Sequence, residues 1–100
     1  MQKVTSVRLR SGVVIGEGHP CFVVAEIGNN HQGEVELARQ MIDKAAEAGA
    51  QAVKFQKRCT EALLTREGRA APYTGCNSFG PTYGEHRNAL ELSIEEKAHV

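Results

Sequence analysis

The sequence predicts an α/β fold in which parallel strands are joined by a helix, and three observations lead to this prediction. An apolar run from Cys21 to Ile27 reads as a buried strand, a helical pattern follows from about Glu34 to Ala48, and a second β-prone run covers about Ala52 to Gln56. A strand, a helix and a strand with short connections form a βαβ unit, whose two strands lie parallel. Parallel strands of this kind occur in open α/β sheets and in TIM barrels.

The composition limits the possible functions. The 100 residues include 12 basic and 12 acidic ones, so no basic excess indicates binding to a nucleic acid or to an anionic membrane. No apolar run reaches the roughly 18 residues of a membrane-spanning helix, and the N-terminus lacks the apolar core of a signal peptide. The cysteines, Cys21, Cys59 and Cys76, are odd in number and widely spaced. This spacing favours a reducing cytoplasm over a disulfide framework or a zinc site.

Residues 1–20 are predicted to form a hairpin and a connector. Two short β-prone runs within residues 7–15 flank Ser11-Gly12, and a two-residue turn with a glycine between such runs is typical of a β-hairpin. Pro20 keeps the residue before it extended, so the connector leads directly into the first core strand.

The central helix is predicted from apolar residues at helical spacing, which are Leu37, Met41, Ala45 and Ala48. Gly49 supplies the left-handed residue that commonly ends a helix.

After residue 57 the pattern becomes mixed. Glycines and prolines interrupt any long element up to residue 81, and a connection of this length in a compact domain is usually a functional loop. Two S/T-x-x-E capping boxes, Thr82 to Glu85 and Ser93 to Glu96, predict that short helices begin there. The second helix would begin within two turns of Val100, so we expect the chain to be the N-terminal part of a longer protein.

Two charged residues mark the candidate site. In parallel α/β folds, chemistry takes place where strands end at their carboxyl side, and Glu26 and Lys54 lie near the ends of the two predicted strands. Alternation along the strands places Lys54 and Gln56 on one face, and Glu26 on the matching face of its own strand. An acid and a base are therefore expected to meet at one edge of the sheet. A structural ion pair is the alternative, because such pairs also occur outside active sites.

The turn after the first strand carries His31 but no recognised binding motif. A lone histidine beside a turn is more often a hydrogen-bonded structural residue than a metal ligand. No second histidine lies at ligand spacing, so this segment is not predicted to form a metal site. Gly28 and Gly33 do not form the G-x-G-x-x-G fingerprint of a dinucleotide site.

Three segments together resemble a known family: AEIGNNHQG, AGAQAVKFQK and PYTGCNSFGPTYGEHRNALELS. From about Gly16 onward the chain is similar to the N-terminal part of sialic acid synthases, the N-acetylneuraminate synthase-like enzymes. The resemblance implies a partial (β/α)₈ TIM barrel in residues 1–100. The hairpin and connector would occupy 1–20, and the first two to three βα units 21–100. The rest of the barrel and a C-terminal antifreeze-like domain would lie outside the chain.

The resemblance also implies a reaction. Sialic acid synthases condense phosphoenolpyruvate with N-acetylmannosamine, or with its 6-phosphate, to a nonulosonic acid, and they use a divalent metal such as Mn²⁺ or Mg²⁺. By match of motif, Glu26 is similar to the family's acid/base carboxylate and Lys54 to the lysine that holds phosphoenolpyruvate. Gln56 and Asn77 correspond to residues that contact the sugar. The family's metal ligands would lie beyond this chain.

Two alternatives accompany this interpretation. The first is a synthase for another nonulosonic acid, such as legionaminic or pseudaminic acid, and the second is a non-catalytic barrel segment that only keeps the fold. We expect a cytoplasmic enzyme that forms a homodimer when full length. The chain of 100 residues alone is expected to be inactive and poorly folded, because a partial barrel leaves strand edges unpaired.

Overall fold

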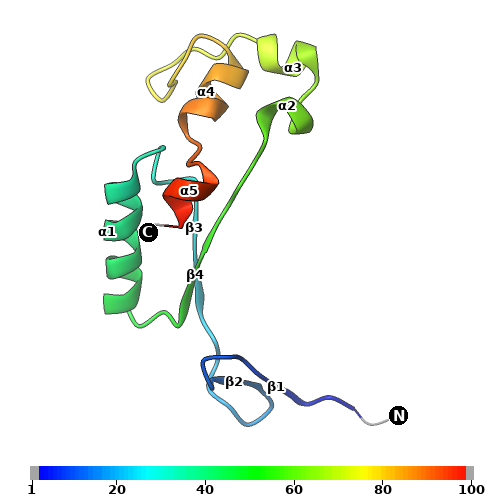
Figure 1. Cartoon of the computed structure of the whole chain (residues 1–100), viewed down its shortest axis with the longest axis vertical. Helices are drawn as coiled ribbons and strands as arrows, with labels where there is room; N and C mark the ends of the chain where they lie inside the picture. The colour runs from blue at the N-terminus through cyan, green and yellow to red at the C-terminus, as the bar shows by residue number, and fades with distance from the viewer. Residues whose placement is uncertain (1–2, 99–100) are drawn as a thin grey trace.

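The computed structural model describes residues 3–98, and within them two small sheets and five helices follow one another along an elongated molecule (Figure 1). The antiparallel hairpin at one end consists of β1 (Ser6–Arg8) and β2 (Val14–Gly16). The central βαβ unit consists of β3 (Val24–Gly28), α1 (Val35–Glu47) and β4 (Ala52–Phe55). The remaining helices are α2 (Thr60–Leu63), α3 (Arg66–Ala70), α4 (Tyr83–Ala89) and α5 (Ile94–Lys97).

The predicted hairpin is present, but its loop is one residue longer than expected. The Leu9 N–H donates to the Val13 carbonyl over 2.8 Å, and the Gly12 N–H donates to the Leu9 carbonyl over 2.9 Å. These bonds leave a three-residue loop, in which Gly12 has a φ of +94°. A glycine with positive φ at the last position is the usual solution for a loop of this length.

The parallel pairing of β3 and β4 is confirmed, with a later start for the first strand. The strand was predicted from Cys21, whereas β3 begins at Val24, and Val23, which lies before it, is half-exposed. Glu26 pairs with Lys54, and Gly28 pairs with Phe55. One extra residue therefore lies between the two pairs on β3, which makes a β-bulge.

The apolar core is small. The buried apolar side chains among residues 3–98 are Ile27, Ala38 and Leu92. Ala38 is fully buried on α1, the helix that lies alongside the sheet (Figure 1), and its small side chain allows a close approach. The radius of gyration is 17.9 Å, whereas a compact domain of this length has about 13 Å. The structure is thus a βαβ unit with attached segments, and by itself it does not form a barrel.

Both predicted capping boxes are confirmed. The Thr82 side chain accepts from the Glu85 N–H and the Glu85 side chain accepts from the Thr82 N–H, and Ser93 and Glu96 do the same at α5. The short helix α3 was not predicted from the pattern, and the Thr65 hydroxyl caps it. Within residues 3–98, no helix has the length and apolar character needed to cross a membrane.

Candidate functional site

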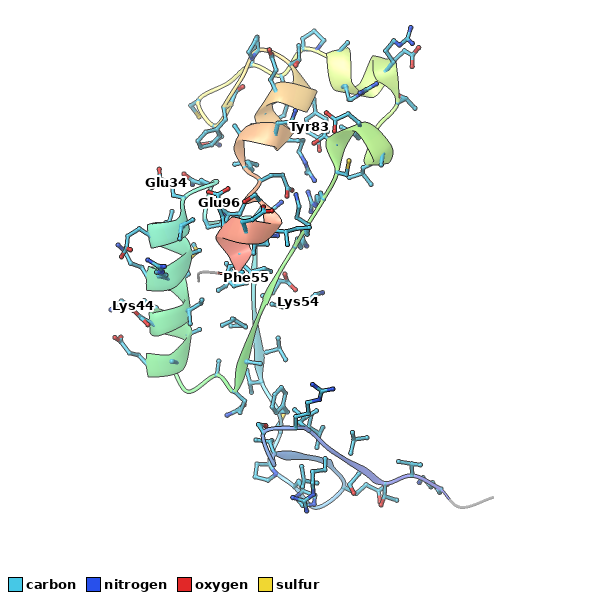
Figure 2. All side chains as sticks on the ribbon, in the orientation of Figure 1. Glu34, Lys44, Lys54, Phe55, Tyr83 and Glu96 are labelled. Carbon is cyan, nitrogen blue, oxygen red and sulfur yellow. The ribbon has the colours of Figure 1, made fainter. Side chains whose placement is uncertain are left out.

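Glu26 and Lys54 lie side by side, as strand parity predicts. They are register partners in β3 and β4, and Lys54 Nζ is 3.3 Å from Glu26 Oε2. In Figure 2, Lys54 extends from β4 away from α1. The side chain of Glu26 is 48% exposed and that of Lys54 is 64% exposed. An ion pair this exposed contributes only about 0–1 kcal/mol to stability. The Glu26–Lys54 ion pair therefore contributes little to the stability of the fold, and both side chains are accessible to a ligand.

Gln56 lies close to this pair, beside the β-bulge of β3. Ile27 is the extra residue and is buried, while Gly28 adopts a φ of +58°. Bulges of this kind redirect side chains and are frequent next to active sites. A Cβ on Gly28 would lie 3.6 Å from Glu26 Oε1 and 3.9 Å from Gln56 Nε2. Glu26 thus directs one oxygen toward Lys54, while its other oxygen and the Gln56 amide both lie next to Gly28.

Gln56 is itself held on three sides. The Arg58 guanidinium donates from Nη2 to the side-chain oxygen of Gln56. The Gln56 N–H donates to the Gly28 carbonyl over 3.4 Å, and the Gln56 carbonyl accepts from Lys97 Nζ of α5. The end of β4 is therefore fixed both to the end of β3 and to a helix near the C-terminus.

Glu91, which sequence reasoning missed, joins the two strand ends. Its Oε1 accepts from Asn29 Nδ2 over 3.1 Å. Its Oε2 accepts from Lys57 Nζ over 3.2 Å and from the Arg58 N–H over 3.3 Å. Only 12% of this side chain is exposed. The sequence signal for it is faint: a carboxylate between two leucines, of which Leu92 is fully buried.

His31 is a buried structural residue, in agreement with its interpretation from the sequence. Its Nδ1 accepts from the Gly33 N–H over 3.1 Å, and its ring centroid lies 5.8 Å from that of Phe55. Burial lowers the pKa of His31, the positive charge of Lys97 lowers it further, and Glu91 opposes the shift. His31 is therefore held neutral. Among residues 3–98, its Nε2 atom has no hydrogen-bond partner.

Asn77 is not brought to the pair. It lies exposed on the loop between α3 and α4, which Figure 1 shows at the end of the molecule opposite the hairpin. Within residues 3–98, no hydrogen bond or ion pair joins it to Glu26, Lys54 or Gln56. The loop forms its own hollow of about 210 Å³, lined by residues 73–78.

The described residues do not fit a metal site. Among residues 3–98, no group of three or more histidine, cysteine, aspartate or glutamate side chains could hold a metal ion. The three cysteines are exposed and free, so they form neither a disulfide nor a thiolate cluster. The metal that the family resemblance implies finds no ligand set in this part of the chain.

The fold and the candidate site together indicate the class of protein. The chain is an α/β protein that carries an acid, a base and an amide near the carboxyl ends of two parallel strands, which is where such folds place their chemistry. The sequence model of the NeuB family matches residues 41–100. The chain belongs to the NeuB family.

Several synthases are similar to this chain. It is 48% identical over 82 residues to the N-acetylneuraminate-9-phosphate synthases of Mus musculus and Homo sapiens, and each comparison covers 82% of the chain and 23% of the relative. It is 39% identical over 82 residues to an N,N'-diacetyllegionaminic acid synthase of Legionella pneumophila, covering 81% of the chain and 23% of the relative. The chain thus spans about a quarter of the length of these curated relatives.

Proposed function

We propose that this chain is the N-terminal part of a synthase that condenses phosphoenolpyruvate with an N-acetylated amino sugar, N-acetylmannosamine or its 6-phosphate, to a nonulosonic acid. The observation that carries this proposal is the exposed Glu26–Lys54 pair next to Gln56, in a chain 48% identical to synthases of this kind. We call the polypeptide in which this chain is continued through a closed (β/α)₈ barrel the complete synthase. It would carry a C-terminal antifreeze-like domain, form a homodimer and act in the cytoplasm.

Lys54 is suited to hold phosphoenolpyruvate. This substrate carries a phosphate and a carboxylate, and an ammonium group forms strong, charge-assisted hydrogen bonds with both. The Lys54 side chain is 64% exposed and has Glu26 as its ion-pair partner. An incoming anion can therefore replace the carboxylate as the partner of Lys54 at little cost, because an exposed pair is worth only about 0–1 kcal/mol.

Glu26 is suited to move a proton. When the methylene carbon of phosphoenolpyruvate bonds to the sugar aldehyde carbon, the C=C and C=O π bonds are consumed and the neighbouring carbon of phosphoenolpyruvate becomes an oxocarbenium centre. Water adds to this centre and loses a proton, and cleavage of the C–O bond to the phosphoryl group releases inorganic phosphate and leaves a keto group. The aldehyde oxygen becomes a hydroxyl and takes up a proton. A carboxyl group within hydrogen-bond reach can supply it, and the carboxylate can later accept one. Displacement of Glu26 from Lys54 by the substrate would free the carboxylate for this role. Gln56, on the same side of Gly28, would contact the sugar.

A divalent metal, Mn²⁺ or Mg²⁺, would polarise the sugar carbonyl. The residues described here do not supply its ligands, which we place in the part of the complete synthase outside residues 3–98. No step assigned to Glu26 or Lys54 depends on it.

A second candidate differs only in the sugar. The 39% identity to a legionaminic acid synthase supports condensation of phosphoenolpyruvate with a different N-acetylated sugar. Comparison of turnover with N-acetylmannosamine, its 6-phosphate and the diacetylated sugar of the legionaminic acid reaction distinguishes the two candidates.

The deciding experiment separates the two charged residues by their kinetics in the complete synthase. Glu26→Gln keeps the shape and removes the basicity, so turnover should fall by roughly 10²–10⁴ while substrate KM values change little. Lys54→Ala should raise the KM for phosphoenolpyruvate by roughly ten- to a hundredfold, because one charge-assisted contact is worth about 1.5–3 kcal/mol.

Matched substitutions on the exposed side of α1, Glu36→Gln and Lys44→Ala, serve as controls and should leave the kinetics unchanged. Near-normal turnover of Glu26→Gln would mean that the pair is structural and that another group moves the proton, whereas a complete synthase without turnover would favour the non-catalytic barrel segment.

A further inference from the structure

We propose that Arg58 is a positioning residue that fixes the Gln56 amide as a hydrogen-bond donor toward the sugar. The end of β4 would then select a sugar oxygen that accepts a hydrogen bond, either a carbonyl or a hydroxyl oxygen. This inference rests on the proposed function and deepens it, because it assigns the polarity of one substrate contact and a residue that controls this polarity.

The orientation of the amide follows from the chemistry of the guanidinium group. A glutamine amide has an acceptor oxygen and a donor nitrogen of nearly the same shape, whereas a guanidinium group can only donate. Because Arg58 Nη2 bonds to the amide, the atom that faces Arg58 must be the oxygen. The NH₂ group of Gln56 then lies on the other side, where it is 3.9 Å from the position of a Cβ on Gly28.

The NH₂ group is presented at the candidate site. The other side chain next to Gly28 is Glu26, whose Oε1 lies 3.6 Å from the same Cβ position. Gly28 has no side chain to fill the space between the two groups, and its φ of +58° is one that glycine adopts at no steric cost. A sugar oxygen that enters here meets the donor of Gln56 beside the carboxylate.

Arg58 is held in place by its own backbone. Its N–H donates to Glu91 Oε2 over 3.3 Å, and its carbonyl accepts from Lys57 Nζ over 3.1 Å. The carboxylate that accepts from Arg58 is only 12% exposed. The backbone from which the guanidinium extends is therefore anchored, and Gln56 loses less conformational freedom when a ligand binds.

A double-mutant cycle on the complete synthase tests this proposal. Arg58→Met removes the donors and keeps much of the length of the side chain. It should raise the KM for the amino sugar about three- to tenfold, the usual worth of one hydrogen bond, and leave the KM for phosphoenolpyruvate unchanged. Gln56→Ala should have a similar effect, and the double variant should be no worse than Gln56→Ala alone. Arg58→Lys keeps one charged donor and should restore part of the loss.

The same substitution at the exposed Arg66 of α3 is the matched control and should not change either KM. Additive effects of Arg58→Met and Gln56→Ala, or an unchanged sugar KM in Arg58→Met, would overturn the proposal for Arg58 and leave the synthase function intact. A complete synthase without condensation activity would overturn both. A rise in the KM for phosphoenolpyruvate in both Arg58→Met and Arg58→Lys would show general damage to the site and would also count against it.

Discussion

The two neighbouring strand ends that form the candidate site are held in different ways. After β3 the chain is fixed by its backbone and by burial: Gly28 takes a left-handed conformation, the Asn30 N–H donates to the Ile27 carbonyl over 3.1 Å, and His31 is fully buried. After β4 the chain is fixed by polar and charged side chains, and its partners Glu91 and Lys97 come from distant segments.

The two strand ends are therefore expected to be sensitive to different substitutions. The β3 end should be sensitive to any added atom and insensitive to salt, because its contacts are close and mostly uncharged. The β4 end should tolerate changes of size but respond to the loss of a single charge. The catalytic carboxylate proposed here, Glu26, lies on β3, whereas Lys54 lies on β4 and Gln56 follows β4 directly.

The largest effect is expected from Gly33→Ala. Gly33 has a φ of +78°, and a Cβ there would lie 2.4 Å from the Ala89 carbonyl oxygen at the end of α4. Left-handed strain and forced displacement of backbone together should cost about 2–5 kcal/mol of unfolding free energy, measured by urea denaturation of the complete synthase. Gly49→Ala is the matched control, because Gly49 has a φ of +92° but open space around it. Equal losses for the two variants would mean that the β3 end is not tightly packed against α4.

A smaller effect is expected from Glu91→Gln. The amide keeps the shape but removes the ion pair with Lys57 and places a donor group among the donors of Asn29 and Arg58. The expected loss is about 1–3 kcal/mol, and it should shrink in high salt.

Glu47→Gln breaks an ion pair of the same 3.2 Å length, but one with two exposed side chains, so it should cost less than about 0.5 kcal/mol. Indistinguishable losses for the two variants would contradict the view that charges hold the β4 end.

The smallest effect concerns pH and the β3 end. Because burial lowers the pKa of His31 below its ordinary value of 6.5, the unfolded chain binds the proton more tightly than the folded one. The contribution of His31 to the free energy of unfolding is therefore fully present above pH 6.5. It falls as the pH drops below this value, by at most about 1.4 kcal/mol at pH 5.5.

Urea denaturation of the complete synthase at pH 7.5 and 5.5 measures this loss, which His31→Gln should reduce. His19→Gln, at an exposed residue, should leave it unchanged. A loss of the same size in the His31→Gln variant would assign the pH dependence to other groups.

Features set by neighbouring residues were predictable from the sequence. The two capping boxes depend on residues three apart, and the βαβ unit depends on alternation and helical spacing within short segments. The same alternation correctly placed Glu26 and Lys54 together. Their chemical roles remain predictions, as does the sugar contact of Asn77, which lies apart from them.

Features set by distant residues were not predictable. Nothing near Glu91 indicates that it accepts from Asn29, 62 residues earlier in the chain. The need for glycine at position 33 likewise depends on the carbonyl of Ala89, which lies far along the chain. The β-bulge could not be predicted from the sequence of β3. Strict alternation assumes that each residue of one strand pairs with one residue of the other, whereas Ile27 has no partner on β4.

The hydrogen bond from Lys97 to the Gln56 carbonyl has a consequence for synthesis on the ribosome. The two residues are 41 positions apart, and at about 5–20 residues per second the second one follows the first by roughly 2–8 s. During that interval the Gln56 carbonyl and the partners of Glu91 lack their final contacts. The candidate site is therefore completed late in the synthesis of this segment, only after α5 has emerged.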